Sequence, residues 1–239
     1  MSEFLESLRF LSFDGGWGWN LVRGLASTLQ IALGAFFLGL SIGLFGALGK
    51  LHGSAPVRWL LEIYTTLIRA VPELVLILLL YYAGTQLVNE VLAMFGRRPI
   101  DISGLVAGIA VLGIVQGAYA TEVIRGAMRA VPRGQLEAAA AFGMRPSLLL
   151  RRITVPAMIP FALPGLANLW LIVMKDTALL AVVGFTELAL TTRQAAGSTR
   201  AYFMFFLVAA LIYLCLTLIS NVVFRHLERR ARRGQPTLA

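Results

Sequence analysis

Five apolar segments, each about as long as a membrane-crossing helix, constrain the fold of this chain more than any other feature of its sequence. They lie at about 25–48, 74–95, 102–124, 157–183 and 202–224. About 20 apolar residues are needed to cross the roughly 30 Å hydrocarbon layer of a bilayer. Backbone groups in lipid must bond to one another, which favours helices, and the segments lack the alternating apolar pattern of barrel strands. The sequence therefore predicts an all-α integral membrane protein.

The composition supports this fold class. Of the 239 residues, 58% are hydrophobic and 14% are charged, whereas soluble domains carry about 25% charged residues. We expect one membrane domain at 25–224, preceded by an amphipathic lead-in at 1–24 and followed by a basic tail at 225–239. Five spans are few for a complete transport path and the sequence shows no internal repeat, so we expect a pore formed by two subunits.

The positive charges are distributed unevenly along the chain. The formal net charge is +9, and 14 of the 21 Lys and Arg residues fall in the segments after the first and third spans, at span edges near them, and in the tail. Positive residues tend to remain on the cytoplasmic side of a membrane. This bias predicts an outer (periplasmic) N-terminus, a cytoplasmic C-terminus and a cytoplasmic segment at 125–156. It argues against nucleic acid as the partner of these charges.

The segment at 125–156 has a helical and basic character. Residues 137–142 favour a helix, and Gly143 is suited to end it in the left-handed conformation. Pro146 is suited to start a second helix, which Pro156 is expected to break or kink before the fourth span. The prediction is a helix–turn–helix elbow at the membrane surface. Its tip would be a knob for a partner's groove or, alternatively, the elbow would be a connector whose arginines lie at lipid phosphates.

The elbow resembles a known family signature. Glu137, Ala138 and Ala139 are followed by Gly143 and then by 153–156, with Val155 where the signature usually has Leu. This pattern resembles the EAA motif of ABC importer permeases. The resemblance implies the type I importer permease fold, in which the elbow is a coupling helix that docks on a cytoplasmic ATPase. The residues that it would present are Glu137, Ala138, Ala139, Phe142, Gly143 and Met144.

Other segments extend the resemblance over about residues 20–230. Those at 64–74, 117–126, 164–168 and 175–180 resemble polar amino acid permeases. The run at 69–75 and the ending at 227–230 are similar to the Q-type permeases of histidine, lysine/arginine/ornithine and opine importers. The resemblance implies a bacterial inner membrane complex with a similar M-type permease, two ATPase subunits and a periplasmic amino acid binding protein. An M-type partner makes a heterodimer the favoured arrangement.

The chain itself contains no pattern for cofactor binding or catalysis. It lacks the Gly-x-x-x-x-Gly-Lys-Ser/Thr loop that cradles nucleotide phosphates, so ATP and Mg²⁺ are expected on the partner ATPase. His52 and His226 have no metal-ligand companions, and no catalytic Ser/His/Asp or Cys/His set is evident. We therefore expect a transport subunit with no metal site and no enzymatic activity of its own.

Polar residues within the apolar segments are candidates for the solute path, because such groups are costly in lipid and usually pair or line a passage. They are Asn168, Lys175, Asp176, Glu73, Glu122 and Tyr119. In the resembled family the fourth span lines the path, and a zwitterionic solute needs both acidic and cationic or amide groups. A packing role is the alternative for each residue. For Glu122 the alternative is a local ion pair with Arg125, three residues later.

These observations predict a permease subunit of an ATP-driven importer for polar amino acids, with a basic amino acid or an opine as the expected solute. Two alternatives remain open. The chain would otherwise be a stand-alone secondary carrier or channel, or a membrane scaffold without transport activity. Uptake by the purified chain without an ATPase would favour the carrier.

Overall fold

Residues 8–99 and 102–232 are described by the computed structural model, and every regular element among them is a helix. The elements are η1 (Leu8–Leu11), α2 (Gly18–His52), α3 (Ala55–Ala70), α4 (Glu73–Met94), α5 (Gly104–Arg129), α6 (Arg133–Ala141), α7 (Pro146–Leu149), η2 (Leu150–Thr154), α8 (Val155–Asp176), η3 (Thr177–Val183), α9 (Leu188–Thr199) and α10 (Tyr202–Ala231). Among these residues, five helices are long and apolar enough to cross a membrane, one of them being the continuous run Pro146–Val183. The all-α prediction is confirmed.

The first long helix starts earlier than expected. The lead-in was predicted to extend to residue 24, but α2 begins at Gly18, and residues 1–7 of the lead-in lie outside the described part. At 1.5 Å per residue, the 35 residues of α2 span about 52 Å, longer than the hydrocarbon layer. The helix therefore extends past the membrane core at one or both ends.

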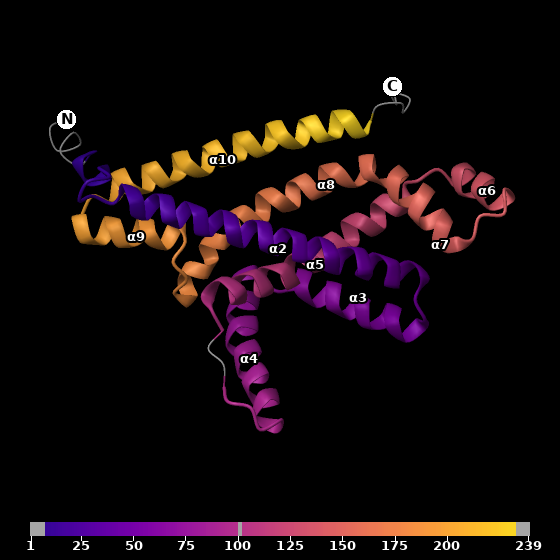
Figure 1. Cartoon of the computed structure of the whole chain (residues 1–239), viewed down its shortest axis with the longest axis horizontal. Coiled ribbons are helices and arrows are strands. Elements are labelled where there is room, and N and C mark those ends of the chain that lie inside the picture. The colour runs from indigo at the N-terminus through magenta and orange to yellow at the C-terminus, as the bar shows by residue number, and fades with distance from the viewer. Residues whose placement is uncertain (1–7, 100–101, 233–239) are drawn as a thin grey trace.

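Helices α2 and α5 pack closely at the centre of the molecule (Figure 1). A Cβ atom on Gly43 would lie 2.5 Å from the Cβ of Ala120, and one on Gly46 would lie 2.3 Å from the Thr121 hydroxyl oxygen. Small residues at such positions let two helix backbones approach each other. The glycines of the first and third spans thus allow these two spans to pack closely against each other.

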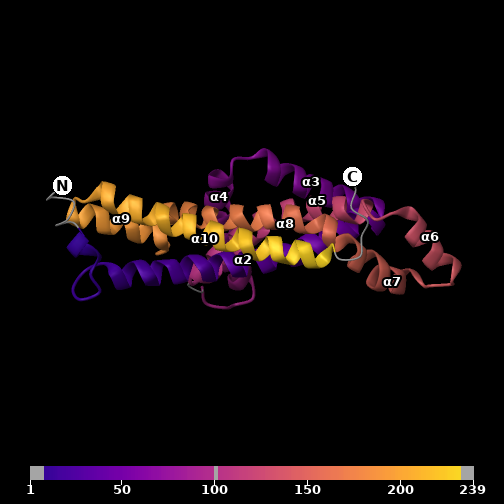
Figure 2. The same ribbon diagram turned by 90° about the horizontal axis from the view of Figure 1, so that it is seen from above.

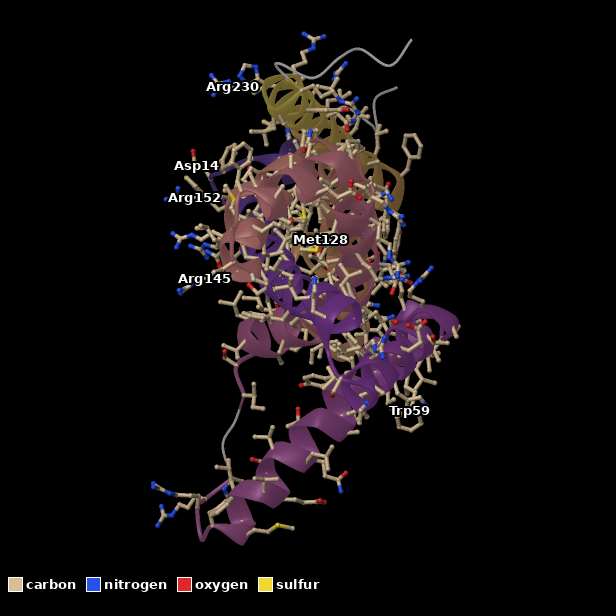
Figure 3. All side chains as sticks on the ribbon, turned by 90° about the vertical axis from the view of Figure 1, so that its right-hand side faces the viewer. Asp14, Trp59, Met128, Arg145, Arg152 and Arg230 are labelled. Carbon is tan, nitrogen blue, oxygen red and sulfur yellow. The ribbon has the colours of Figure 1, made fainter. Side chains whose placement is uncertain are left out.

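Helix α4 extends away from the other helices. Figures 1 and 3 both show it projecting from the bundle where α3 ends. Among its 22 residues only Leu76 and Ile77 are buried, and large apolar side chains such as Leu79 and Leu87 are exposed. In this single chain most of α4 therefore lacks a protein neighbour, although its apolar surface needs either lipid or a second protein.

The fourth span differs from the prediction at its start. Pro156 was expected to break or kink the helix, but it lies in the first turn of α8 and the chain continues from α7 through the π-helical turn η2. Pro156 has no N–H for the carbonyl of Arg152, and its ring would press on that carbonyl in a regular α-helix. The wider π turn immediately before it, closed by a bond from Val155 N–H to Leu150 O, accommodates the proline without a break.

The segment at 186–199 is rich in Thr, Ser and Gly, residues that are common in loops. The structure nevertheless places the helix α9 at Leu188–Thr199. Glu187 caps this helix, because its carboxylate accepts hydrogen bonds from the N–H groups of Ala189 at 2.8 Å and Leu190 at 2.7 Å. Leu188, Ala195 and Ala196 of α9 pack with Leu21 and Phe205 in one buried cluster. Burial of this face and the cap outweigh weak local helix propensity.

Candidate coupling elbow and solute path

The predicted elbow is formed by α6 and α7. Gly143 ends α6 with φ +73°, in the left-handed region. The N–H of Gly143 donates to Ala140 O at 2.9 Å, and the N–H of Met144 donates to Ala139 O at 3.2 Å. This pair of bonds is a Schellman motif, which uses glycine to satisfy the last carbonyls of a helix. The predicted cap at Gly143 is confirmed.

The tip of the elbow, at Phe142 and Gly143, is exposed among the residues that the structure describes. Phe142 is 87% exposed, and an added Cβ on Gly143 would meet no atom within 4 Å. Glu137 and Ala138 are exposed, whereas Ala139 is buried and Met144 is half-buried. Figures 1 and 2 show α6 and α7 projecting beyond the ends of the long helices. The elbow therefore presents an aromatic side chain and a bare turn outward, with Ala139 facing inward.

Basic side chains gather at the same end of the molecule. Figure 3 looks onto this end, and the side chains of Arg145 and Arg152 point outward from the elbow, with Arg230 of α10 on another side of the same face. Arg129 ends α5 and Arg230 lies in the last turn of α10. Four of the positive residues predicted to share one side of the membrane, Arg129, Arg145, Arg152 and Arg230, thus lie at one end of the structure.

Glu122 belongs to a cluster of charges near that end. The Lys50 ammonium lies 2.7 Å from Glu122 and 2.7 Å from Glu62, and donates to the Thr65 hydroxyl at 2.6 Å. Arg125 also pairs with Glu122, as the alternative reading of the sequence predicted. The Lys50 side chain is only 3% exposed. Glu122 is therefore engaged in a structural ion-pair cluster that joins α2, α3 and α5.

Three other predicted path residues come together where the α3–α4 junction meets α5 and the end of α8. The side chain of Glu73 lies near those of Tyr119 and Asp176. Arg69 acts electrostatically on Tyr119, and Lys175 acts on Asp176. Two neighbouring carboxylates repel each other unless a proton or another positive charge lies between them. The arrangement of Glu73 and Asp176 suits a cationic group.

Asn168 does not join this group. It lines a separate pocket of about 280 Å³ between α8 and α10, together with Asn221, Arg225 and Glu228. Lys175 is exposed beside Asp176, two helical turns from Asn168. The structure thus divides the six predicted path residues into a Glu73–Tyr119–Asp176 group with Lys175 at its edge, the ion-paired Glu122, and Asn168 in its own pocket.

Sequence reasoning missed two buried charged residues. In the sequence, Lys50 is one of the positive charges that follow the first span, and nothing marks Glu187 as a buried residue. Lys50 lies at the end of an apolar run, which alone predicts a side chain that reaches toward water. Its burial depends on Glu62 and Glu122, which are 12 and 72 residues away. For Glu187 the only signal is an acidic residue just before a weak helix, a common pattern on surfaces.

Comparison with known proteins shows the family. Residues 21–233 match the family model of the binding-protein-dependent transport system inner membrane component. The chain is 44% identical over 219 residues to the histidine/lysine/arginine/ornithine transport system permease protein HisQ of Salmonella typhimurium, covering 92% of this chain and 96% of that protein. It is 39% identical over 220 residues to the octopine transport system permease protein OccQ of Rhizobium radiobacter, covering 92% and 93%.

A solved structure agrees with these sequence relationships. The crystal structure of an amino acid ABC transporter with histidines contains a chain that superposes with a TM-score of 0.78 at 31% identity, covering 95% of this chain and 98% of that one. This chain belongs to the family of inner membrane components of binding-protein-dependent transport systems, as a Q-type ABC permease subunit.

Proposed function

We propose that this chain forms part of the transmembrane path of an ATP-driven importer for basic amino acids or opines. A periplasmic binding protein would deliver the solute, and a separate ATPase that binds ATP and Mg²⁺ would drive the transport cycle. The names of the similar permeases, which include histidine/lysine/arginine/ornithine and octopine systems, support this class of solute. The chain would have no enzymatic activity of its own.

The proposed coupling between the ATPase and the permease rests on the elbow. A rigid turn with an exposed aromatic side chain, Phe142, projects from the molecule and contacts nothing else in the described chain. A buried aromatic anchor is the usual centre of a protein interface. We propose that 137–144 docks in a groove of the ATPase, so that movement of the ATPase is transmitted through α6 and α7 to α5 and α8.

Helix α4 supports a second permease subunit as partner. Its exposed apolar side chains include Leu79 and Leu87, and the helix projects from the bundle rather than packing along it. We propose that a similar M-type permease packs against α4 and completes the pore as a heterodimer. The Q-type character of the chain favours a distinct partner over an identical one.

The proposed orientation follows from charge. The end with α6, α7 and the C-terminal turns of α5 and α10 would face the cytoplasm, because positive residues concentrate there. The opposite end, with η1 and α9, would face the periplasm. In this orientation the N-terminus is periplasmic and the C-terminus cytoplasmic, as the charge pattern of the sequence predicts.

The solute site that we propose is the Glu73–Tyr119–Asp176 group. Its two carboxylates would hold the ammonium or guanidinium of a basic side chain, and Lys175 at the edge would face the solute's carboxylate. Asn168 would line the path closer to the cytoplasm. Glu122 is not proposed to contact solute, because Lys50 and Arg125 occupy its carboxylate.

Substitution at Gly143 tests the coupling role. Gly143→Asp is expected to insert normally but to abolish ATP-driven uptake, because the side chain enters the proposed interface without meeting any atom of this chain. Gly96→Asp is a matched control, since Gly96 also has a positive φ, +67°, with open space around it, but lies at the end of α4. Uptake in reconstituted complexes and the membrane level of each variant would be measured. Normal uptake by the Gly143 variant would reject the coupling role.

The rival function is a carrier that works without an ATPase. This function is favoured if proteoliposomes that contain only this chain take up amino acid, driven by an ion gradient or by the gradient of the amino acid itself. It is excluded if uptake appears only after an ATPase and ATP are added. Co-purification of the ATPase with the wild type, but not with Phe142→Ala, would agree with the importer.

A further inference from the structure

The end of the molecule opposite the elbow contains a polar pocket that the proposed function does not use. It has a volume of about 380 Å³ and lies between the start of α2 and the start of α9. Its lining residues are Trp17, Asn20, Arg23, Gly24, Ser27, Thr186, Thr191 and Gln194. The volume falls in the range of about 300–1,000 Å³ that small-molecule sites occupy.

One side chain of this pocket has a buried group without a partner. Thr191 is 2% exposed, and its hydroxyl has no hydrogen-bond partner among the described residues. This hydroxyl points at Gly24 of α2, where an added Cβ would lie 2.8 Å from the oxygen. Both residues line the pocket. A buried hydroxyl without a partner costs free energy, so it marks a place where a polar ligand is expected.

The lining is rich in hydrogen-bond donors and has no acidic side chain. Arg23 provides a guanidinium, Asn20 and Gln194 provide amides, and three residues provide hydroxyls. Arg23 forms no ion pair within residues 8–99 and 102–232. The neighbouring carboxylate of Glu187 does not line the pocket, because it is buried against the N–H groups of Ala189 and Leu190.

From this arrangement we infer an anion site, and we propose that its ligand is the α-carboxylate of an amino acid. A guanidinium that is not neutralised binds a carboxylate through paired N–H groups, and hydroxyl and amide donors add to its selectivity. The Thr191 hydroxyl would donate to the same ligand. The identity of the solute as an amino acid and the placement of this end in the periplasm rest on the proposed function. The pocket would then receive solute before it reaches Glu73 and Asp176.

A cysteine protection experiment reports on this pocket alone. Thr186→Cys, in a Cys215→Ser background, places the only thiol of the chain in the pocket lining. The complete reconstituted complex would be treated with a membrane-impermeant maleimide. L-arginine is expected to slow the modification, and agmatine, which lacks the carboxylate, is expected not to. The protecting concentration is the concentration of L-arginine that halves the rate of modification. Arg23→Gln should raise it at least about tenfold, and Thr191→Val should raise it roughly two- to tenfold.

Two controls locate the effect. Ser198→Cys is exposed on α9 outside the pocket, and its modification should be unaffected by L-arginine. Arg193→Gln removes an exposed charge of α9 that does not line the pocket, and should leave the protecting concentration unchanged. Equal protection by L-arginine and agmatine, or an unchanged concentration in the Arg23 variant, would overturn the carboxylate site.

Two further measurements, protection by lipid and uptake of L-arginine, separate the remaining explanations. If phosphatidylglycerol alone protects the introduced thiol and L-arginine adds nothing, the site holds lipid phosphate and the proposal is rejected. If the same complex takes up L-arginine but L-arginine does not protect the introduced thiol, the carboxylate pocket is rejected and the proposed function is not. Protection without L-arginine uptake rejects the proposed solute class while the carboxylate pocket stands.

Discussion

The ammonium of Lys50 on α2 lies 2.7 Å from the carboxylate of Glu122 on α5, and both residues belong to helices long enough to cross a membrane. The same ammonium reaches Glu62 and Thr65 of α3. A buried lysine is tolerated only when its charge is paired and its donors are satisfied. Lys50 therefore ties α3 to the α2–α5 pair close to the elbow.

Removal of this charge should destabilise the protein. In Lys50→Met the carboxylate of Glu122 keeps only Arg125 as its partner, and Thr65 loses a buried donor. Because Glu122 is still partly solvated and paired, we expect a loss of about 1–3 kcal/mol rather than the larger cost of an isolated buried charge. Thermal unfolding in detergent would measure it. Glu62→Gln is the control and should cost at most about 1 kcal/mol, because Glu62 is 65% exposed. Equal stabilities of the two variants would contradict the central role of Lys50.

The carboxylate pair should determine preference for basic solutes. Glu73→Gln removes one of the two negative charges in the proposed site while keeping its shape. The KM for arginine should rise about tenfold, the size of one charge-assisted hydrogen bond, whereas the KM for glutamine should change less. Asn168→Ala serves as the comparison, because Asn168 lies in a different pocket. A similar change for both solutes would indicate a packing role for Glu73.

Glu187 should make stability depend on pH. Burial raises the pKa of this carboxyl above its ordinary value, although hydrogen bonds from α9 and from Thr28 and Tyr213 oppose the rise. A raised pKa in the folded state gives a contribution to stability that is complete below the unfolded pKa and is lost as the pH rises through the folded pKa. As the pH rises from the unfolded pKa through the folded pKa, the Tm of the wild type should therefore fall relative to that of Glu187→Gln. The glutamine side chain of this variant does not titrate.

Glu187→Ala separates the cap from the charge. It removes the acceptor for Ala189 and Leu190 N–H groups and leaves the hydroxyls of Thr28 and Tyr213 with fewer partners. We expect it to cost about 2–4 kcal/mol at any pH, from the lost cap and the buried polar groups. Thermal unfolding across pH would compare the three proteins. A wild type whose Tm follows that of Glu187→Gln at every pH would show that the carboxyl does not titrate as expected.

Close packing of α2 on α5 should make Gly43 intolerant of substitution. A Cβ at this position would lie 2.5 Å from the Cβ of Ala120 and 2.9 Å from its backbone carbon, so a helix must move. Gly43→Ala should cost about 1–3 kcal/mol. In Gly34→Ala the new Cβ meets the flexible end of Ile109, which can rotate away, and the cost should be smaller. The unfolding midpoints of both variants in detergent would measure the difference. A larger loss of stability in Gly34→Ala than in Gly43→Ala would show that α2 and α5 move apart easily at Gly43.

The helical fold and the elbow can be predicted from local features of the sequence. Length and hydropathy identify the five spans because lipid imposes both on a crossing helix. Gly143 could be recognised because the left-handed cap is a local requirement of a helix end, satisfied within five residues. The first and third spans are rich in glycine, but the sequence does not show that these two spans face each other.

The role of each charged or polar group depends on contacts between distant segments. Glu122 and Glu73 are both acidic residues in apolar spans, yet Lys50 neutralises the first, whereas the second faces Asp176. The partners come from helices up to about a hundred residues apart, and local sequence carries no information on which faces meet. Helix α9 and its pocket with Arg23 depend likewise on burial of Glu187 against Thr28 of α2. Electrostatic and packing energies between distant segments, not local propensity, fix these sites.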